Sequence, residues 1–198
     1  MYDKTIPFYD LILRCDGYAE QPVRLPRGFS IVPYRPGFEA DWARMEREAG
    51  DFDSEDEALR YFAGRYLDRD RDGDILFLLE ETGRAVGSCI AWEDGRNGTN
   101  VHSLHWLIVE EALQGRKLGR ALCLTAMDLF RRKGEGPVYI HTQPWSWKAI
   151  LLYASLGFRV QRSDSFGGYV NRYEDAMRTL KRILPEQQFR MLEENAEN

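Results

Sequence analysis

Apolar and polar residues alternate along several short segments of the chain, and this pattern predicts β-strands. Leu76 to Glu80 and Ala85 to Trp92 flank a turn at residues 82–83, as in an antiparallel hairpin. In the strand predicted from Val101 to Val109, His105 and Val109 belong to one face. Further strands are predicted at Phe29 to Val32, Val138 to Gln143, Phe158 to Gln161 and around Tyr169 and Val170.

Other segments repeat apolar residues at the three-to-four-residue spacing of a helix. Leu118, Leu122 and Leu129 form such a stripe, and Gly134 marks the end of that helix. The step from Ser54 to Glu57 fits a capping box at the start of another helix. The remaining predicted helices are Phe38 to Ala49, Trp147 to Leu156 with Ser146 as N-cap, and a C-terminal amphipathic helix carrying Tyr173, Met177, Leu180 and Leu184.

The order of these elements predicts one mixed α/β domain, with helices on both faces of a central sheet. A chain of 198 residues that is 43% apolar suits one compact core. Residues 1–28 mix aromatic and aliphatic side chains with turn formers, so we expect an arm laid over the domain. The polar segment from Glu93 to Asn100 is expected to be a loop, and residues 162–198 a C-terminal extension of strand and helix.

The charge balance argues against two classes of partner. The 27 basic and 32 acidic residues give a net charge of -5, which disfavours binding to nucleic acid or to anionic lipid. No segment approaches the roughly 20 apolar residues of a membrane span, and the N-terminal residues lack the pattern of a signal peptide. The three cysteines show neither CxxC nor zinc-like spacing. We therefore expect a cytoplasmic protein without a metal.

The segment from Gln114 to Ala121 joins a predicted strand to a predicted helix and contains two glycines. Glycines let a backbone approach a ligand closely, and the free N–H groups at a helix N-terminus attract anions. Arg116, Lys117 and Arg120 add positive charge. The absence of GxxxxGK[ST] and GxGxxG disfavours an ATPase or a dehydrogenase. The segment predicts a metal-free cradle for a pyrophosphate, and a plain tight turn with a solvated basic face is the alternative.

This segment resembles the signature of the GNAT N-acetyltransferase superfamily, which is a β-strand, then [Q/R]xxGx[G/A], then a helix. Gln114 and Gly119 fill the first and last marked positions, and Lys117 replaces the middle glycine. A second block, from Ala149 to Phe158, is similar to the downstream motif of the family, which contains a tyrosine and ends in Gly-Phe. The resemblance covers about residues 29–161 and implies a mostly antiparallel, splayed sheet flanked by helices on both faces.

The resemblance implies acetyl-CoA as the cosubstrate. Its pantetheine arm is expected to bind the exposed backbone of the strand before the turn, much like an added strand. Ser146 stands where the family often has an asparagine that touches the cofactor. The cofactor-binding residues implied in this way are Leu107, Ile108, Val109, Gln114, Gly115, Arg116, Lys117, Leu118, Gly119, Arg120 and Ser146.

The resemblance also implies direct attack of an amine on the thioester, without a covalent enzyme intermediate. Cys123, inside a predicted helix, is accordingly expected to be a core thiol. Tyr153 matches the family tyrosine that protonates the departing thiolate. His105 matches a histidine of the serotonin N-acetyltransferase branch and is the first candidate for the base that removes the amine proton, although a hydrogen-bonded histidine beneath the pocket is the alternative. Other candidates for the base are His141, Glu80 and Glu93.

These features predict an acyl-CoA-dependent N-acetyltransferase that moves an acetyl group from acetyl-CoA to a primary amine of a small molecule. Two alternatives stay open: a protein acetyltransferase acting on a lysine or an N-terminal amine, and a non-catalytic acyl-CoA-binding module. The sequence is compatible with a monomer or a homodimer. Acceptors in this family are bound by variable loops, so the sequence does not identify the amine.

Overall fold

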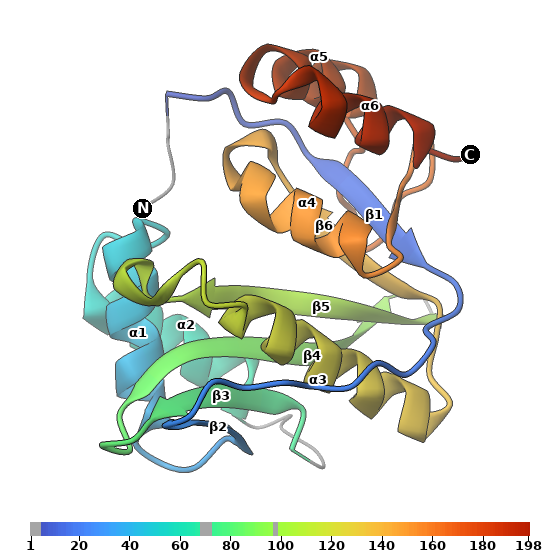
Figure 1. Cartoon of the computed structure of the whole chain (residues 1–198). Coiled ribbons are helices and arrows are strands. Elements are labelled where there is room, and N and C mark those ends of the chain that lie inside the picture. The colour runs from blue at the N-terminus through green and yellow to red at the C-terminus, as the bar shows by residue number, and fades with distance from the viewer. Residues whose placement is uncertain (1–4, 68–72, 97–98) are drawn as a thin grey trace. The chain divides into compact units, whose positions relative to one another are not determined.

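The computed structural model describes residues 5–67, 73–96 and 99–198 of the chain (Figure 1). These residues form two compact units. Unit 1 is built mainly from Glu20–Trp92 and Leu104–Arg132, and unit 2 mainly from the residues up to Ala19, Glu93–Ser103 and Lys133–Asn198. The two longest strands, β4 (Ala85–Arg96) and β5 (Thr99–Val109), each contribute residues to both units.

The other strands are β1 (Leu11–Cys15), β2 (Phe29–Pro33), β3 (Ile75–Glu80), β6 (Val138–Thr142) and β7 (Arg159–Val160). Strands are hydrogen-bonded in the order β2-β3-β4-β5-β6-β1-β7. Among the described pairs, β2 with β3, β3 with β4, and β1 with both β6 and β7 are antiparallel, whereas β5 and β6 are parallel. The prediction of a mixed α/β fold with a mostly antiparallel sheet is confirmed.

Helices α1 (Phe38–Ala49) and α2 (Glu55–Arg65) cover one face of the unit 1 strands. Ser54 caps α2, because its Oγ accepts a hydrogen bond from the N–H of Glu57 at 3.2 Å. The Glu57 carboxylate accepts in return from the N–H of Asp53, so the predicted capping interaction forms with its return bond shifted by one residue. The buried core beneath these helices consists of Trp42, Ala43, Ala58, Phe62, Tyr66, Ile75, Phe77, Ala85, Ile90 and Trp92.

Helix α3 (Leu118–Lys133) lies on the opposite face of the unit 1 strands (Figure 1). The alternation along β3 shows this arrangement. Phe77 belongs to the aromatic core under α1 and α2, whereas its neighbour Leu76 lines a shallow cavity with Thr125 and Leu129 of α3. Unit 1 therefore has helices on both faces of its strands, as the sequence predicted.

In unit 2, β1 is the central strand, and Leu13 pairs with Ile140 of β6 on one side and with Val160 of β7 on the other. Residues 11–13 are all buried, so both faces of β1 are covered. Unit 2 also contains the helices α4 (Trp147–Ser155), α5 (Tyr173–Ile183) and α6 (Glu186–Glu194). Among the described residues, no helix is long and apolar enough to cross a membrane.

The structure corrects several predicted elements. Residues 11–15 of the expected N-terminal arm form β1 within the sheet. The short apolar run at residues 11–13 does not by itself distinguish a strand from other buried structure. The expected loop from Glu93 to Asn100 is wrong where β4 continues to Arg96 and β5 begins at Thr99, while residues 97–98 lie outside the described residues. Tyr169 and Val170 form no strand, and α6 was not predicted.

Candidate functional site

The predicted phosphate cradle lies in unit 1, between the end of β5 and the start of α3. A 3₁₀ turn, η2 (Glu111–Leu113), leads into Gln114, and α3 begins at Leu118. Gly115 and Lys117 have left-handed backbones, with φ angles of 78° and 65°. This conformation is easy for glycine and uncommon for residues with a Cβ. Lys117, which replaces a glycine of the GNAT signature, therefore adopts a backbone conformation that glycine favours.

Hydrogen bonds tie this turn to the end of β5. The side-chain Nε2 of Gln114 donates to the carbonyl of Val109 at 3.1 Å, and the N–H of Glu110 donates to the carbonyl of Val86 at 3.0 Å. The Glu110 carboxylate lies 2.7 Å from a guanidinium nitrogen of Arg44. Gln114, the first residue of the signature, thus fixes the shape of the turn through its side chain.

The start of α3 suits an anion. Its first turn contains no acidic residue, as in α4, whereas α1, α2, α5 and α6 each have an acidic residue there. The first N–H groups of a helix lack intrahelical acceptors, and the helix dipole places positive charge there. Arg116 and Lys117 are exposed beside these groups, while Arg120 donates from Nη2 to the amide oxygen of Gln21 at 2.8 Å. Leu118 is buried, so its side chain anchors the helix in the core.

Strand β5 contains a left-handed residue, Trp106, whose φ is 49°. Such a residue within a strand is typical of a β-bulge, which changes the faces of the residues on either side. His105 faces α2, with its Nδ1 3.2 Å from the hydroxyl of Tyr66. Val109 faces α3, because its Cγ2 and an α3 side chain both lie within 3.4 Å of the point that a Cβ on Gly87 would occupy. The prediction that His105 and Val109 share one face is therefore wrong.

Gly87 of β4 allows β5 to approach closely. A Cβ at this position would lie 2.8 Å from the carbonyl oxygen of Ile108 and 3.3 Å from Cγ2 of Val109. Real Cβ atoms essentially never come this close to a backbone atom, so the contact requires glycine. The segment from Leu107 to Val109, where pantetheine is expected, is thus held by backbone packing against β4.

His105 belongs to an aromatic network in unit 1. The hydroxyl of Tyr66 accepts a hydrogen bond from Nε1 of Trp106 at 2.6 Å and also contacts Nδ1 of His105. Burial raises the pKa of Tyr66, so the phenol stays protonated. Which partner donates in the Tyr66–His105 bond depends on the imidazole tautomer. The network engages Nδ1 of His105 and so orients its Nε2. The sequence did not predict a role for Tyr66, because no motif marks this buried tyrosine at the end of α2.

Ser146 and Tyr153 lie in unit 2. Tyr153 is part of α4, and Ser146 belongs to the turn that precedes this helix. Ser146 occupies the cap position, but its hydroxyl makes no capping bond and instead accepts from Nε2 of Gln143 at 3.2 Å. Its predicted capping role is therefore wrong. Tyr153 is 6% exposed, and its carbonyl accepts from the N–H groups of Leu156 and Phe158. The Gly-Phe end of the second motif thus ends α4 through a hydrogen bond from Phe158 to the backbone of Tyr153.

His141 of unit 2 is paired with Asp10, a residue that the sequence did not mark as functional. Nε2 of His141 lies 2.6 Å from Oδ1 of Asp10, and the imidazole stacks on Tyr169 with ring centroids 3.7 Å apart. Burial lowers the pKa of His141, although Asp10 acts in the opposite direction. A neutral imidazole here donates Nε2–H to Asp10 and leaves Nδ1 as an acceptor. No local sequence pattern links Asp10 to His141.

The surroundings of Glu80 and Cys123 indicate structural roles for both residues. Hydrogen bonds from Arg84 and Thr82 lower the pKa of Glu80. Glu80 therefore belongs to a surface ion pair with Arg84 and is poorly suited to act as the base. Cys123 is fully buried, and its interaction with Cys89 together with burial raises the pKa of its thiol. A protonated, inaccessible thiol is a poor nucleophile, in agreement with the expected core role of Cys123.

The structure places the predicted site residues in two sets. Unit 1 contains His105, the segment from Leu107 to Val109, and the turn from Gln114 to Arg120. The turn and the strand segment are brought together by the Gln114–Val109 hydrogen bond, and the His105 network precedes them on β5. Unit 2 contains Ser146 and Tyr153.

Comparisons with known proteins agree on one family. A model described as "Acetyltransferase (GNAT) family" matches residues 39–158. The chain is 29% identical over 158 residues to a mycothiol acetyltransferase of Sanguibacter keddieii, covering 74% of this chain and 50% of the relative. The chain spans about half the length of the curated relatives it matches.

Solved structures show the same fold. A GCN5-related N-acetyltransferase from Sphaerobacter thermophilus matches with a TM-score of 0.59 at 20% identity, covering 78% of this chain and 49% of that chain. An aminoglycoside N-acetyltransferase in complex with CoA matches with a TM-score of 0.55 at 18% identity, covering 75% of this chain and 99% of that chain. At such identities the likeness concerns the fold.

Proposed function

The chain belongs to the GNAT acetyltransferase family, and we propose that it transfers an acetyl group from acetyl-CoA to a primary amine of a small molecule. One observation carries this proposal. The left-handed backbone of Lys117 leads into a helix whose first turn contains no acidic residue, beside the exposed cations Arg116 and Lys117. Backbone N–H groups at a positive helix end are suited to the pyrophosphate of CoA.

The segment from Leu107 to Val109 is proposed to bind the pantetheine arm. The left-handed residue Trp106 lies in β5 just before this segment, and Gly87 allows β4 to pack closely against the backbone of the segment. An extended ligand can add to a strand backbone through main-chain hydrogen bonds. The residues present therefore fit the cosubstrate without a metal.

In the proposed reaction, the amine nitrogen bonds to the acetyl carbon while the carbon–sulfur bond breaks. One amine proton goes to Nε2 of His105, whose Nδ1 is engaged by Tyr66. Tyr153 gives its hydroxyl proton to the departing thiolate and regains a proton from solvent. No covalent enzyme intermediate is involved.

His141 is a second candidate for the base. Its hydrogen bond to Asp10 orients the imidazole, and its lowered pKa keeps Nδ1 available as a proton acceptor near neutral pH. Since His105 is held by a neutral phenol and His141 by a carboxylate, their variants should differ in pH dependence.

A small-molecule acceptor is supported by the relatives named mycothiol acetyltransferase. The relevant experiment is a screen for acetyl-CoA consumption, detected as released CoA thiol, across amino sugars, polyamines, amino-acid derivatives and a peptide panel. Turnover with a small amine supports the proposal. Turnover confined to peptides would replace it with a protein acetyltransferase, and binding of acetyl-CoA without any turnover would indicate a non-catalytic module.

Binding is measured separately by thermal shift. Acetyl-CoA should raise the melting temperature, as expected for a ligand that binds only the folded state, whereas ATP and NAD should not. Gly119→Glu should abolish the shift, because it places a carboxylate at the start of α3. A folded Gly119→Glu protein that binds acetyl-CoA normally would contradict the proposed cradle.

A further inference from the structure

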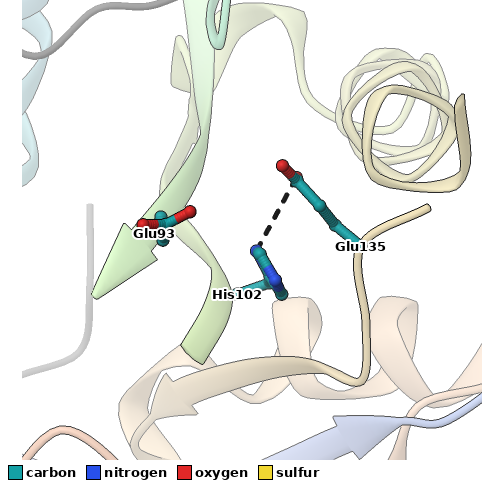
Figure 2. Close-up of side chains that lie close together, drawn as sticks. All are labelled: Glu93, His102 and Glu135. Atoms are coloured by element: carbon teal, nitrogen blue, oxygen red, sulfur yellow. Dashed lines mark ion pairs between the residues drawn. The ribbon is translucent and has the colours of Figure 1, made fainter. Parts of the chain in front are cut away.

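Three side chains of unit 2 gather outside the residues proposed for acetyl transfer. They are Glu93 of β4, His102 of β5 and Glu135, which follows α3 (Figure 2). One imidazole nitrogen and one oxygen from each carboxylate all lie within 4.8 Å of one another. We propose that these residues bind a divalent transition-metal ion, with Zn²⁺ as the best-suited ion.

The spacing between His102 and Glu135 fits a shared ion as well as the ion pair that a protonated imidazole would form. Nδ1 of His102 lies 3.6 Å from Oε2 of Glu135, which exceeds hydrogen-bond length. Two ligand atoms that are each about 2.0 to 2.1 Å from a tetrahedral ion lie about 3.3 to 3.4 Å apart. Figure 2 shows the imidazole and the carboxylate directed toward each other. A small adjustment of either side chain therefore allows both to coordinate one ion.

The exposure of the three ligands suits an ion that is held from one side and open to solvent on the other. The side chains of His102 and Glu135 are 14% and 27% exposed, whereas Glu93 is exposed. Partly buried ligands lose little hydration when the ion binds, and Glu93 adds an exposed ligand on the open side. Three protein ligands leave the fourth tetrahedral position for water.

The chemistry of the donors selects the class of ion. Mg²⁺ and Ca²⁺ prefer sites made entirely of oxygen ligands, whereas one imidazole with two carboxylates suits Zn²⁺ and its spectroscopic substitute Co²⁺. The sequence predicted no metal, because the three ligands are spread along the chain without a recognisable spacing. A bound ion would link β4 and β5 to the segment that precedes β6, and so would stabilise unit 2.

The proposal is tested with the full chain after treatment with a chelator. Calorimetric titration with Zn²⁺ should give one ion per chain, and Co²⁺ should give the visible absorption of a tetrahedral site. Glu135→Gln and His102→Ala should each weaken Zn²⁺ binding at least about tenfold, or about 1.4 kcal/mol. Glu93→Gln should weaken it less, because Glu93 is the exposed ligand.

Two matched controls remove similar groups elsewhere in unit 2. Glu194→Gln removes an exposed carboxylate from α6, and His141→Ala removes another imidazole; both should keep the wild-type affinity. If His102→Ala does not fold, Glu135→Gln keeps the size of the side chain and decides the question. Several weak ions per chain, or equal binding by wild type and Glu135→Gln, would show adventitious binding and overturn the proposal.

Discussion

In the turn from Gln114 to Arg120 the backbone provides the proposed binding surface, whereas at His105 and Tyr153 single side-chain atoms are proposed to move protons. Lys117 illustrates the first case, since it differs from the glycine of the signature and still adopts a φ of 65°. The turn should therefore tolerate side-chain changes that keep its conformation. The reacting side chains should not tolerate loss of one hydroxyl or one imidazole, even where the fold is unchanged.

Tyr153→Phe should produce the largest effect on the reaction. It removes one hydroxyl from a residue that is 6% exposed and keeps the ring, which packs beside Phe158 with centroids 6.0 Å apart. General acid catalysis is typically worth about 10² to 10⁴ in rate, so kcat should fall by that order. The dissociation constant for acetyl-CoA should change little, because the pyrophosphate and pantetheine residues lie in unit 1.

Steady-state kinetics and acetyl-CoA binding, measured on the same preparation, distinguish a catalytic role of Tyr153 from a structural one. Wild-type turnover in Tyr153→Phe would return this residue to a packing role. Loss of binding or of folding would show that the hydroxyl is structural.

His105→Ala should give the next largest effect, with a loss of at least about tenfold in kcat/KM if the imidazole removes the amine proton. The loss should be greatest at low pH, where the amine is mostly charged, and should shrink at high pH. His141→Ala is the matched comparison, because it removes the other candidate imidazole. A pH–rate profile that is unchanged in His105→Ala and altered in His141→Ala would move the role of base to His141.

Gly87→Ala tests the backbone-built region by adding one methyl group without removing a side chain that is proposed to move a proton. The new Cβ would lie 2.8 Å from the carbonyl of Ile108, so the strands must separate. Such overpacking typically costs about 1 to 3 kcal/mol in the free energy of unfolding, and acetyl-CoA binding should weaken as well. Gly64→Ala is the control, because Gly64 lies in α2 with open space around its Cβ position. Equal stability of both variants in urea would contradict the close approach of β5 to β4.

The pH dependence of stability should show a smaller effect at His141. Burial lowers the pKa of His141, so the folded protein binds this proton less readily than the unfolded chain. The contribution of His141 is therefore present above the ordinary histidine pKa of about 6.5 and is lost as the pH falls through the lowered value. Urea midpoints of wild type should decline between pH 7.5 and 5.5, and less steeply in His141→Gln. An identical slope in both proteins would contradict the lowered pKa.

Local patterns were sufficient to predict much of the fold. Helix α1 begins and ends where the sequence predicted, and Ser54 caps α2, because both depend on residues adjacent in the chain. The strand β1 was missed because a buried central strand has no alternation. Elements that depend on residues adjacent in the chain could thus be predicted, whereas an element defined by tertiary packing, such as β1, could not.

The candidate site shows the same limit. The turn at Lys117 could be predicted because its residues are contiguous, whereas the left-handed Trp106 changed the face of His105 without any glycine to signal it. The partners Tyr66 and Asp10 come from distant segments and became visible only in the fold. The cluster of Glu93, His102 and Glu135 is a further case of residues that only the fold brings together.

The most direct measurement of the central claim is a calorimetric titration of acetyl-CoA into Lys117→Gly and Lys117→Ile. Glycine adopts the left-handed conformation without strain, whereas a β-branched residue strongly disfavours it. If the backbone binds the pyrophosphate, Lys117→Gly should stay within a few-fold of the wild-type affinity, and Lys117→Ile should lose at least about tenfold, or about 1.4 kcal/mol. Equal losses in both variants would assign binding to the lysine charge, and no loss in either would contradict the proposed cradle.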